Sequence, residues 1–363
     1  MTRPLAFTCD IFCRVVDNFG DIGVCWRLAR QLHAEFGIAP RLIVDDLASF
    51  QKIAPALDLT LTQQFIQGIE IIVWKKAPTL LPSECVIEAF GCELPRDYLA
   101  AMATQATTPV WLNLEYLSAE SWVGEHHLMP SPHPRLPLTK TFFFPGFTPK
   151  TGGILREKNR PNPAPVLAFG DNSPLRIYVL GYPNVALAAL LNALATSGKN
   201  YECTFAEGAL GSAALAHTPS KHVKIQTHPF VPQEDFDALL AAHDLCFARG
   251  EDSFVRAQLA AKPFIWQIYP QAENAHLAKL EAFLALYCNG LAADAANALR
   301  ALSMAWNEQD STRIAPAWND FHAHLPAIGR HAQNWAAKLT QQPDLASNLV
   351  EFVMTSQQKV AKI

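Results

Sequence analysis

Short apolar runs alternate with amphipathic stretches along most of the chain, and the pattern occurs twice. In the first half, strand-like apolar segments lie near residues 5–12, 41–46, 69–75, 85–90, 109–114 and 141–146, with helical patterns at about 22–36, 47–56 and 95–104. The alternation restarts after residue 174, with strand-like "LRIYVLGY", "YECTF", "HVKIQTHPFV", "DLCFA" and "PFIWQIY" and helical "VALAALLNALATSG", "QEDFDALLAAH" and "SFVRAQLAA". Strands that alternate with helices predict a parallel sheet covered on both faces. The sequence therefore predicts two successive doubly wound α/β halves.

The composition changes between residues 148 and 174, where Pro, Gly, Asn and charged residues gather. A chain of 363 residues also suits two domains of about 150 residues each. From about residue 272 the pattern is almost wholly helical. We therefore expect a first domain over 1–150, a linker over 151–174 and a second domain over 175–345. A C-terminal helix over 346–363 could pack back on the first domain.

Two doubly wound halves followed by a helical tail are typical of GT-B glycosyltransferases, in which two Rossmann-like domains face a central cleft. The same pattern suits other enzymes with two Rossmann-like domains, because such sheets host many chemistries. In either case the fold predicts where ligands bind: at the carboxyl ends of the parallel strands, in the cleft.

Composition excludes several other classes of protein. Half of the residues are hydrophobic, 17% are charged and the formal charge is −4, so nothing points to a nucleic-acid or membrane partner. The first residues do not resemble a signal peptide, and no apolar run approaches the roughly 20 residues of a membrane-spanning helix. The eight cysteines form no C-x-x-C pair, and the histidines lack zinc-binding spacing. We expect a cytoplasmic protein with free thiols and without a metal.

The turn "VVDNFGDIG" at residues 15–23 follows the first predicted strand and therefore lies at a carboxyl strand end. It does not match the G-x-G-x-x-G fingerprint of dinucleotide-binding folds. One interpretation is that Asp21 caps the next helix and Asn18 stabilises the turn. This leaves Asp17 unexplained. A pair of carboxylates at a strand end is also a candidate for general-base catalysis.

A second candidate site lies in "ARGEDSFVRAQL", between an apolar strand and a helix. A helix N-terminus offers free amides and a partial positive charge, which suit a diphosphate. Arg249 could add a bidentate contact to phosphate and Ser253 a hydroxyl, while Glu251 could accept from sugar hydroxyls. The alternative is a capping box in which Asp252 or Ser253 is the N-cap.

Two weaker motifs have mainly structural interpretations. Asp235 and Asp237 have the spacing of a metal-binding D-x-D, but they open a helix, where acidic residues favour the helix dipole. The segment "WLNLEYLSAESW" at 111–122 could offer an aromatic and acidic wall to a basic acceptor, or it could be a strand and turn with core aromatics.

Four stretches of the chain together resemble the EarP family, the bacterial protein-arginine rhamnosyltransferases that modify elongation factor P: "VVDNFGDIGVCWRLARQL", "WLNLEYLSAESW", "FFFPGF" and "RGEDSFVRAQLAAKPFIWQIYPQ". The resemblance extends over nearly the whole chain. It implies a GT-B fold and transfer of L-rhamnose from dTDP-β-L-rhamnose to one arginine of elongation factor P. It also implies inversion at the anomeric carbon, without a metal or other cofactor.

The resemblance also implies roles for individual residues. It makes Asp21 the catalytic base and Asp17 the second aspartate, which orients the acceptor. Tyr182 falls where the family has an aromatic cradle for thymine, although Leu180 and Gly181 depart from its more common Phe-Cys-Tyr. The candidate donor-binding residues are Asn18, Phe19, Gly20, Tyr182, Gln233, Arg249, Glu251, Asp252, Ser253 and Tyr269.

The sequence is also compatible with two functions from other classes. One is a GT-B transferase with a small-molecule or glycan acceptor, and the other is a non-catalytic module that binds a nucleotide sugar.

Overall fold

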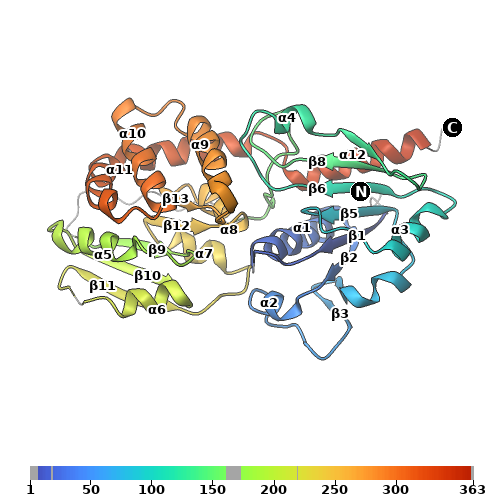
Figure 1. Cartoon of the computed structure of the whole chain (residues 1–363), viewed down its shortest axis with the longest axis horizontal. Helices are drawn as coiled ribbons and strands as arrows, with labels where there is room; N and C mark the ends of the chain where they lie inside the picture. Colours follow the sequence, from blue (N-terminus) through green and yellow to red (C-terminus); the bar gives the residue numbers. More distant parts are fainter. Residues whose placement is uncertain (1–6, 18, 161–172, 219, 361–363) are drawn as a thin grey trace. The chain divides into compact units, whose positions relative to one another are not determined.

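The computed structural model describes residues 7–17, 19–160, 173–218 and 220–360 (Figure 1). The chain forms two compact units. The first comprises residues 1–160 and 342–363, and the second comprises 161–341. Residue 18 and most of the expected linker, 161–172, lie outside the described residues.

The first unit contains an eight-stranded sheet with the order β3-β4-β2-β1-β5-β6-β8-β7. Neighbouring strands are parallel except at the two edges, where β3 and β7 pair antiparallel with β4 and β8. The elements are β1 (Thr8–Cys13), α1 (Gly20–Phe36), β2 (Ala39–Val44), α2 (Leu47–Gln51), β3 (Gln63–Ile66), β4 (Ile69–Val73), η1 (Trp74–Thr79), β5 (Cys85–Ala89), α3 (Arg96–Ala103), β6 (Val110–Leu114), α4 (Val123–His126), β7 (Pro130–Pro132), β8 (Thr139–Phe143) and α12 (Leu345–Val360).

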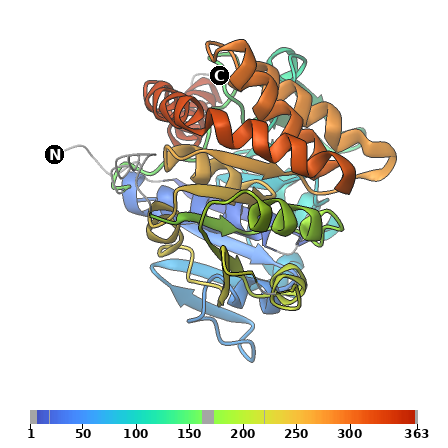
Figure 2. The ribbon, with the colours of Figure 1, turned by 90° about the vertical axis from the view of Figure 1, so that its left-hand side faces the viewer.

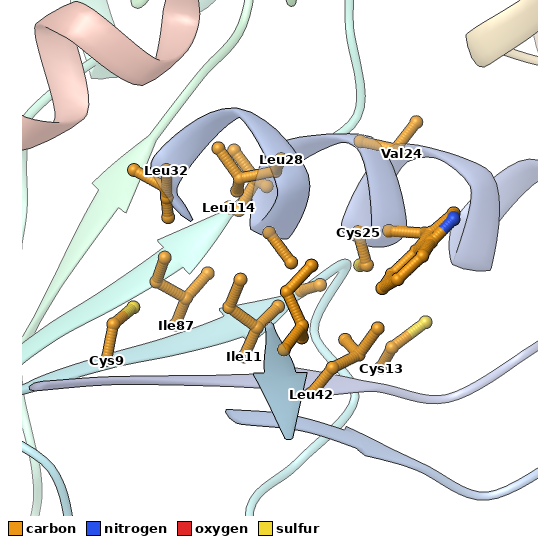
Figure 3. Close-up of a cluster of buried hydrophobic side chains, with 14 of the residues drawn as sticks. Cys9, Ile11, Cys13, Val24, Cys25, Leu28, Leu32, Leu42, Ile87 and Leu114 are labelled. Carbon is orange, nitrogen blue, oxygen red and sulfur yellow. The ribbon is translucent and has the colours of Figure 1, made fainter. Parts of the chain in front are cut away.

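Helix α1 packs its apolar face on the central strands of this sheet. Leu28 and Leu32 of α1 belong to the same buried cluster as Cys9 and Ile11 of β1, which Figure 3 shows. The helix ends at Gly37, which adopts the left-handed conformation (φ 67°) and donates its N–H to the carbonyls of the last turn. This packing fixes the N-terminus of α1, and with it the polar turn that follows β1.

The cysteines lie inside the apolar segments. All eight are free and buried. Burial raises the pKa of the Cys203 thiol to about 12, and that of the Cys246 thiol to about 12. Thiols with raised pKa values stay protonated and behave as small apolar groups.

The end of the chain returns to the first unit. Helix α12 packs on α1 and β6, and Leu345, Leu349 and Val353 join the hydrophobic core that contains the buried face of α1. The first residues of the expected linker also pack there. Ile154 and Leu155 are each 5% exposed. The first unit thus extends to residue 160 and takes in 342–345, which differs from the boundaries expected from composition.

The second unit contains a five-stranded parallel sheet with the order β11-β10-β9-β12-β13. Helices α10 and α11 lie side by side in this unit (Figure 2). The elements are β9 (Leu175–Val179), α5 (Leu187–Thr196), β10 (Tyr201–Ala206), α6 (Ala209–Leu215), β11 (Val223–His228), α7 (Phe236–Ala241), β12 (Leu245–Arg249), α8 (Asp252–Leu259), β13 (Phe264–Gln267), η2 (Ala272–Asn274), α9 (Ala275–Tyr287), α10 (Ala293–Asn307) and α11 (Ser311–Thr340).

The predicted fold class is confirmed. Both units are α/β with a mainly parallel sheet, and the C-terminal part of the chain is helical. In the part of the chain that the structure describes, no helix combines the length and the apolar character needed to span a membrane.

Candidate functional site

In the first unit, Asp21 holds the turn that follows β1. Its side chain is 1% exposed, and its Oδ2 accepts hydrogen bonds from the backbone N–H groups of Val16 (2.8 Å) and Asp17 (2.9 Å). The N-cap position of α1 is occupied by Phe19, which makes no side-chain capping bond. Asp21 is therefore not the helix cap. It lies one residue inside α1 and fixes the preceding turn.

The other carboxylate oxygen of Asp21 contacts a residue from a neighbouring strand end. Tyr116, which follows β6, donates its hydroxyl to Asp21 Oδ1 at 3.0 Å. The Tyr116 ring is stacked on Phe90, which follows β5, with ring centroids 4.3 Å apart and 15° between the planes. The adjacent strands β1, β5 and β6 thus bring these three residues together at the carboxyl ends of the strands. The sequence pointed to the segment 111–122 without singling out Tyr116.

Asp17 lies next to Asp21 and is 8% exposed. Its carboxylate packs against Gly20, where a Cβ atom would collide with Asp17 Oδ2. The absence of a side chain at Gly20 thus leaves room for the Asp17 carboxylate. Phe19 is half-buried against the core of the unit, and the predicted donor contact Asn18 lies outside the described residues.

In the second unit, the loop between β12 and α8 is tied to the first turn of the helix. The Ser253 hydroxyl accepts from the backbone N–H of Arg249 (3.0 Å) and donates to the Arg249 carbonyl (2.5 Å). Glu251 occupies the N-cap position, with no side-chain capping bond, and Gly250 has a positive φ of 59°. The capping box considered from the sequence is therefore not formed, since the Ser253 side chain closes the loop instead.

Arg249 lies beside Tyr182, and Tyr182 in turn contacts Tyr269. Its guanidinium donates to the Gly181 carbonyl (3.2 Å) and lies 4.9 Å from the centre of the Tyr182 ring. The Tyr182 ring meets Tyr269 edge to face, with centroids 5.5 Å apart. Tyr182 is 7% exposed and Tyr269 is 41% exposed, so the pair has a buried member and an accessible one.

The remaining predicted donor residue, Gln233, also joins this group. It is buried, and its side-chain amide donates to Asp252 at 3.1 Å. The structure thus brings Gln233 to the first turn of α8.

The D-x-D motif has a structural partner. Both carboxylate oxygens of Asp237 bind the buried side chain of Arg256, with 2.7 Å between Nε and Oδ1. Asp235 is the N-cap of α7 but makes no side-chain capping bond. Among the described residues, no group of three or more His, Cys, Asp or Glu side chains is placed to hold a metal ion.

The comparisons with known proteins identify the family. The family model described as the elongation factor P (EF-P) rhamnosyltransferase EarP matches residues 9–354. The chain belongs to the EarP family. The protein-arginine rhamnosyltransferase of Pseudomonas putida is 45% identical over 96% of this chain and 99% of that one. That of Neisseria meningitidis is 36% identical over 97% and 98%.

Solved structures agree with the assignment to the EarP family. A structure that describes EarP-mediated arginine glycosylation of translation elongation factor EF-P has a TM-score of 0.64 and 33% identity, covering 97% of this chain and all of that one. The calicheamicin glycosyltransferase CalG4 has a TM-score of 0.52 at 13% identity, over 98% and 99% of the two chains, and this likeness concerns the fold alone. The chain is thus a glycosyltransferase with the GT-B type of fold.

Proposed function

We propose that this protein transfers L-rhamnose from dTDP-β-L-rhamnose to the guanidinium of one arginine of elongation factor P, with inversion at the anomeric carbon. The modification would activate the factor for relief of ribosome stalling at polyproline. Family membership and the names of the relatives support the reaction. The observation that carries the proposal is the buried Asp21 carboxylate, held at a carboxyl strand end by two amides and a tyrosine beside a second aspartate.

The acceptor chemistry requires such a pair. An arginine guanidinium has a pKa above about 12 and is a poor nucleophile while it is protonated and delocalised. Asp17 would orient the guanidinium, and Asp21 would take its proton as the bond from nitrogen to the anomeric carbon forms. A single displacement needs this one base on the face opposite the leaving group, so the product has the inverted configuration.

The donor would bind the second unit. Arg249 and the amides at the start of α8 would stabilise the departing diphosphate. Glu251 and Asp252 would accept from sugar hydroxyls, with Gln233 beside them, and Tyr182 and Tyr269 offer aromatic faces to the base. In the first unit, Phe19 and Gly20 remain candidate donor contacts. The protein would act in the cytoplasm, without a nucleic-acid or membrane partner.

Intact mass spectrometry tests the proposal directly. We expect elongation factor P, incubated with the protein and dTDP-rhamnose, to gain the mass of one deoxyhexose on a single arginine. A transferase with a small-molecule or glycan acceptor would consume the donor only with another acceptor. A non-catalytic module would bind dTDP-rhamnose and leave the factor unchanged, and either result would contradict the proposal.

Tyr116→Phe should slow the transfer without weakening donor binding. The change removes the hydroxyl that donates to Asp21 Oδ1 and keeps the ring stacked on Phe90. A hydrogen bond to a charged group contributes about 1.5–3 kcal/mol, so we expect a loss of about 10-fold or more in kcat. Steady-state kinetics at saturating donor measures this loss. An unchanged kcat would show that Tyr116 does not position the base.

Arg249→Ala should weaken the binding of dTDP and dTDP-rhamnose. The guanidinium lies 4.9 Å from the centre of the Tyr182 ring, and a charge-assisted hydrogen bond to phosphate contributes about 1.5–3 kcal/mol. Calorimetry should therefore give a dissociation constant at least about 10-fold higher. Wild-type affinity in this variant would place the donor site elsewhere.

We also propose that no metal takes part, and we expect EDTA to leave the rate of transfer unchanged. Arg249 and the start of α8 supply positive charge for the diphosphate, and Asp237 of the D-x-D is paired with Arg256. The measurement is the initial rate before and after chelation. A rate that is lost in EDTA and restored by Mg²⁺ would contradict this proposal and would make Asp235 and Asp237 candidate metal ligands.

A further inference from the structure

Gln267, which the sequence did not single out, connects the candidate donor loops of the second unit. It is the last residue of β13, stands opposite Arg249 of β12 in the register, and is 3% exposed. Its side-chain Oε1 accepts the backbone N–H of Tyr182 at 2.9 Å. Because β12 lies between β9 and β13 in the sheet, the side chain reaches across a strand end to the loop after β9.

The peptide between Gly181 and Tyr182 is therefore held on both sides. Its carbonyl accepts from the Arg249 guanidinium and its N–H donates to Gln267. The two side chains come from the paired last residues of neighbouring strands. The same peptide thus fixes the ring of Tyr182 and the guanidinium that lies against that ring.

Gly181 is matched to this arrangement. Its φ is not positive, so the glycine is not required by the backbone conformation. A Cβ at this position would lie 2.8 Å from Gln267 Oε1 and 2.7 Å from Leu210 Cδ2. The leucine methyl is the end of a flexible side chain, whereas the glutamine oxygen is held by its hydrogen bond. Gln267 Oε1 and Leu210 thus occupy the space that a side chain at position 181 would need.

Gln267 is itself held firmly. Its carbonyl accepts the N–H of Gly250, in the loop before α8. On either side of it, Asn307 of α10 accepts the N–H of Ile268 (3.0 Å) and donates to the carbonyl of Trp266 (2.7 Å). The end of β13 therefore offers a fixed point from which the Tyr182 loop can be oriented.

We propose that Gln267 is a positioning residue for the nucleotide donor: it holds the Gly181–Tyr182 peptide so that Tyr182 and Arg249 are arranged before the donor binds. The inference rests on the donor site proposed above. It adds Gln267 to that site and explains how Tyr182 and Arg249 are held in position. A loop that is already in its binding conformation does not lose affinity to ordering on binding. If the loop populated that conformation a fifth of the time, the apparent dissociation constant would rise about fivefold.

The test compares Gln267→Met with Gln267→Glu. Methionine keeps the length of the side chain and removes the acceptor, whereas glutamate keeps an oxygen that can accept the Tyr182 N–H. We expect Gln267→Met to raise the dissociation constant for dTDP and the KM for the donor by about fivefold or more, with a much smaller change in kcat. Gln267→Glu should recover most of the affinity. Calorimetry and steady-state kinetics give the two readouts.

Gln258→Met is the matched control. Gln258 is also a buried glutamine of the second unit, and its Oε1 accepts from Trp335 Nε1 at 2.8 Å, at the far end of α8. Both methionine variants should lower the melting temperature, but only Gln267→Met should weaken dTDP binding. Wild-type affinity in Gln267→Met, or equal weakening in both variants, would overturn the inference. Wild-type protein that does not bind dTDP would overturn the donor assignment itself, and this inference with it.

A second measurement tests the contact between Gly181 and Gln267. Gly181→Ala should weaken dTDP binding in the wild-type background because the added methyl displaces Gln267 Oε1. In a Gln267→Ala background the same change should have little further effect, since the two variants remove one interaction. Fold-changes that simply multiply in the double variant would contradict the proposed contact.

Discussion

Asp21→Asn is expected to lower the rate of transfer by about 10²–10⁴-fold, the usual effect of losing a general base. The amide is nearly isosteric with the carboxylate but cannot take the proton from the acceptor nitrogen. Its oxygen can still accept from the N–H groups of Val16 and Asp17, and its NH₂ can donate to the Tyr116 hydroxyl. The turn should therefore keep its place, and single-turnover kinetics should report the loss of chemistry alone.

Asp45→Asn provides the matched control. Asp45 also accepts a backbone N–H of this turn, that of Val15 at 2.9 Å, and it is exposed. Its replacement removes one negative charge beside the same turn without touching the proposed base, so transfer should stay close to the wild-type rate. Near-normal turnover in Asp21→Asn would exclude Asp21 as the base. An equal loss in both variants would show that the turn, and not proton transfer, is sensitive to charge.

The sequence predicted the fold well where apolar residues form long runs. The central strands of both units and helix α1 lie where the pattern placed them, because buried parallel strands and one-sided helices have distinctive periods. The edge strands β3 and β7 were missed: they are short and half exposed, and β7 contains two prolines. Helix α6 was missed because a short run of small residues has no clear apolar face.

The candidate sites were predictable only in part. The turn at residues 15–23 and the loop before α8 follow strands, so their place at the carboxyl ends could be inferred. The residues that hold them could not. Tyr116 lies 95 positions from Asp21, and Gln267 lies 85 positions from Tyr182. These contacts depend on which strands are neighbours in the sheet. The local pattern of apolar residues predicts single strands but does not predict their order.

The acceptor gives the second large effect. Replacing the target arginine of elongation factor P by lysine should abolish transfer to that position. The proposed site holds two carboxylates with little exposure, 8% for Asp17 and 1% for Asp21. A planar guanidinium can hydrogen-bond to both and still direct one nitrogen at the anomeric carbon, whereas a lysine ammonium is a point charge on a flexible stem. Intact mass spectrometry of the factor measures the outcome, and calorimetry of the lysine variant controls for lost binding.

The same reasoning predicts that the acceptor must be folded. A short peptide around the target arginine would have to lose conformational entropy on entering the site, and it would lack the remaining surface of the N-terminal domain of the factor. We therefore expect a much lower kcat/KM for the peptide than for the folded domain, chiefly through KM, because the base and the donor are the same for both. Equal kcat/KM values would contradict recognition of the folded domain, and efficient modification of the lysine variant would contradict the role given to the two aspartates. Neither result would bear on the dTDP affinities of the Gln267 variants, since calorimetry of those variants needs only the nucleotide.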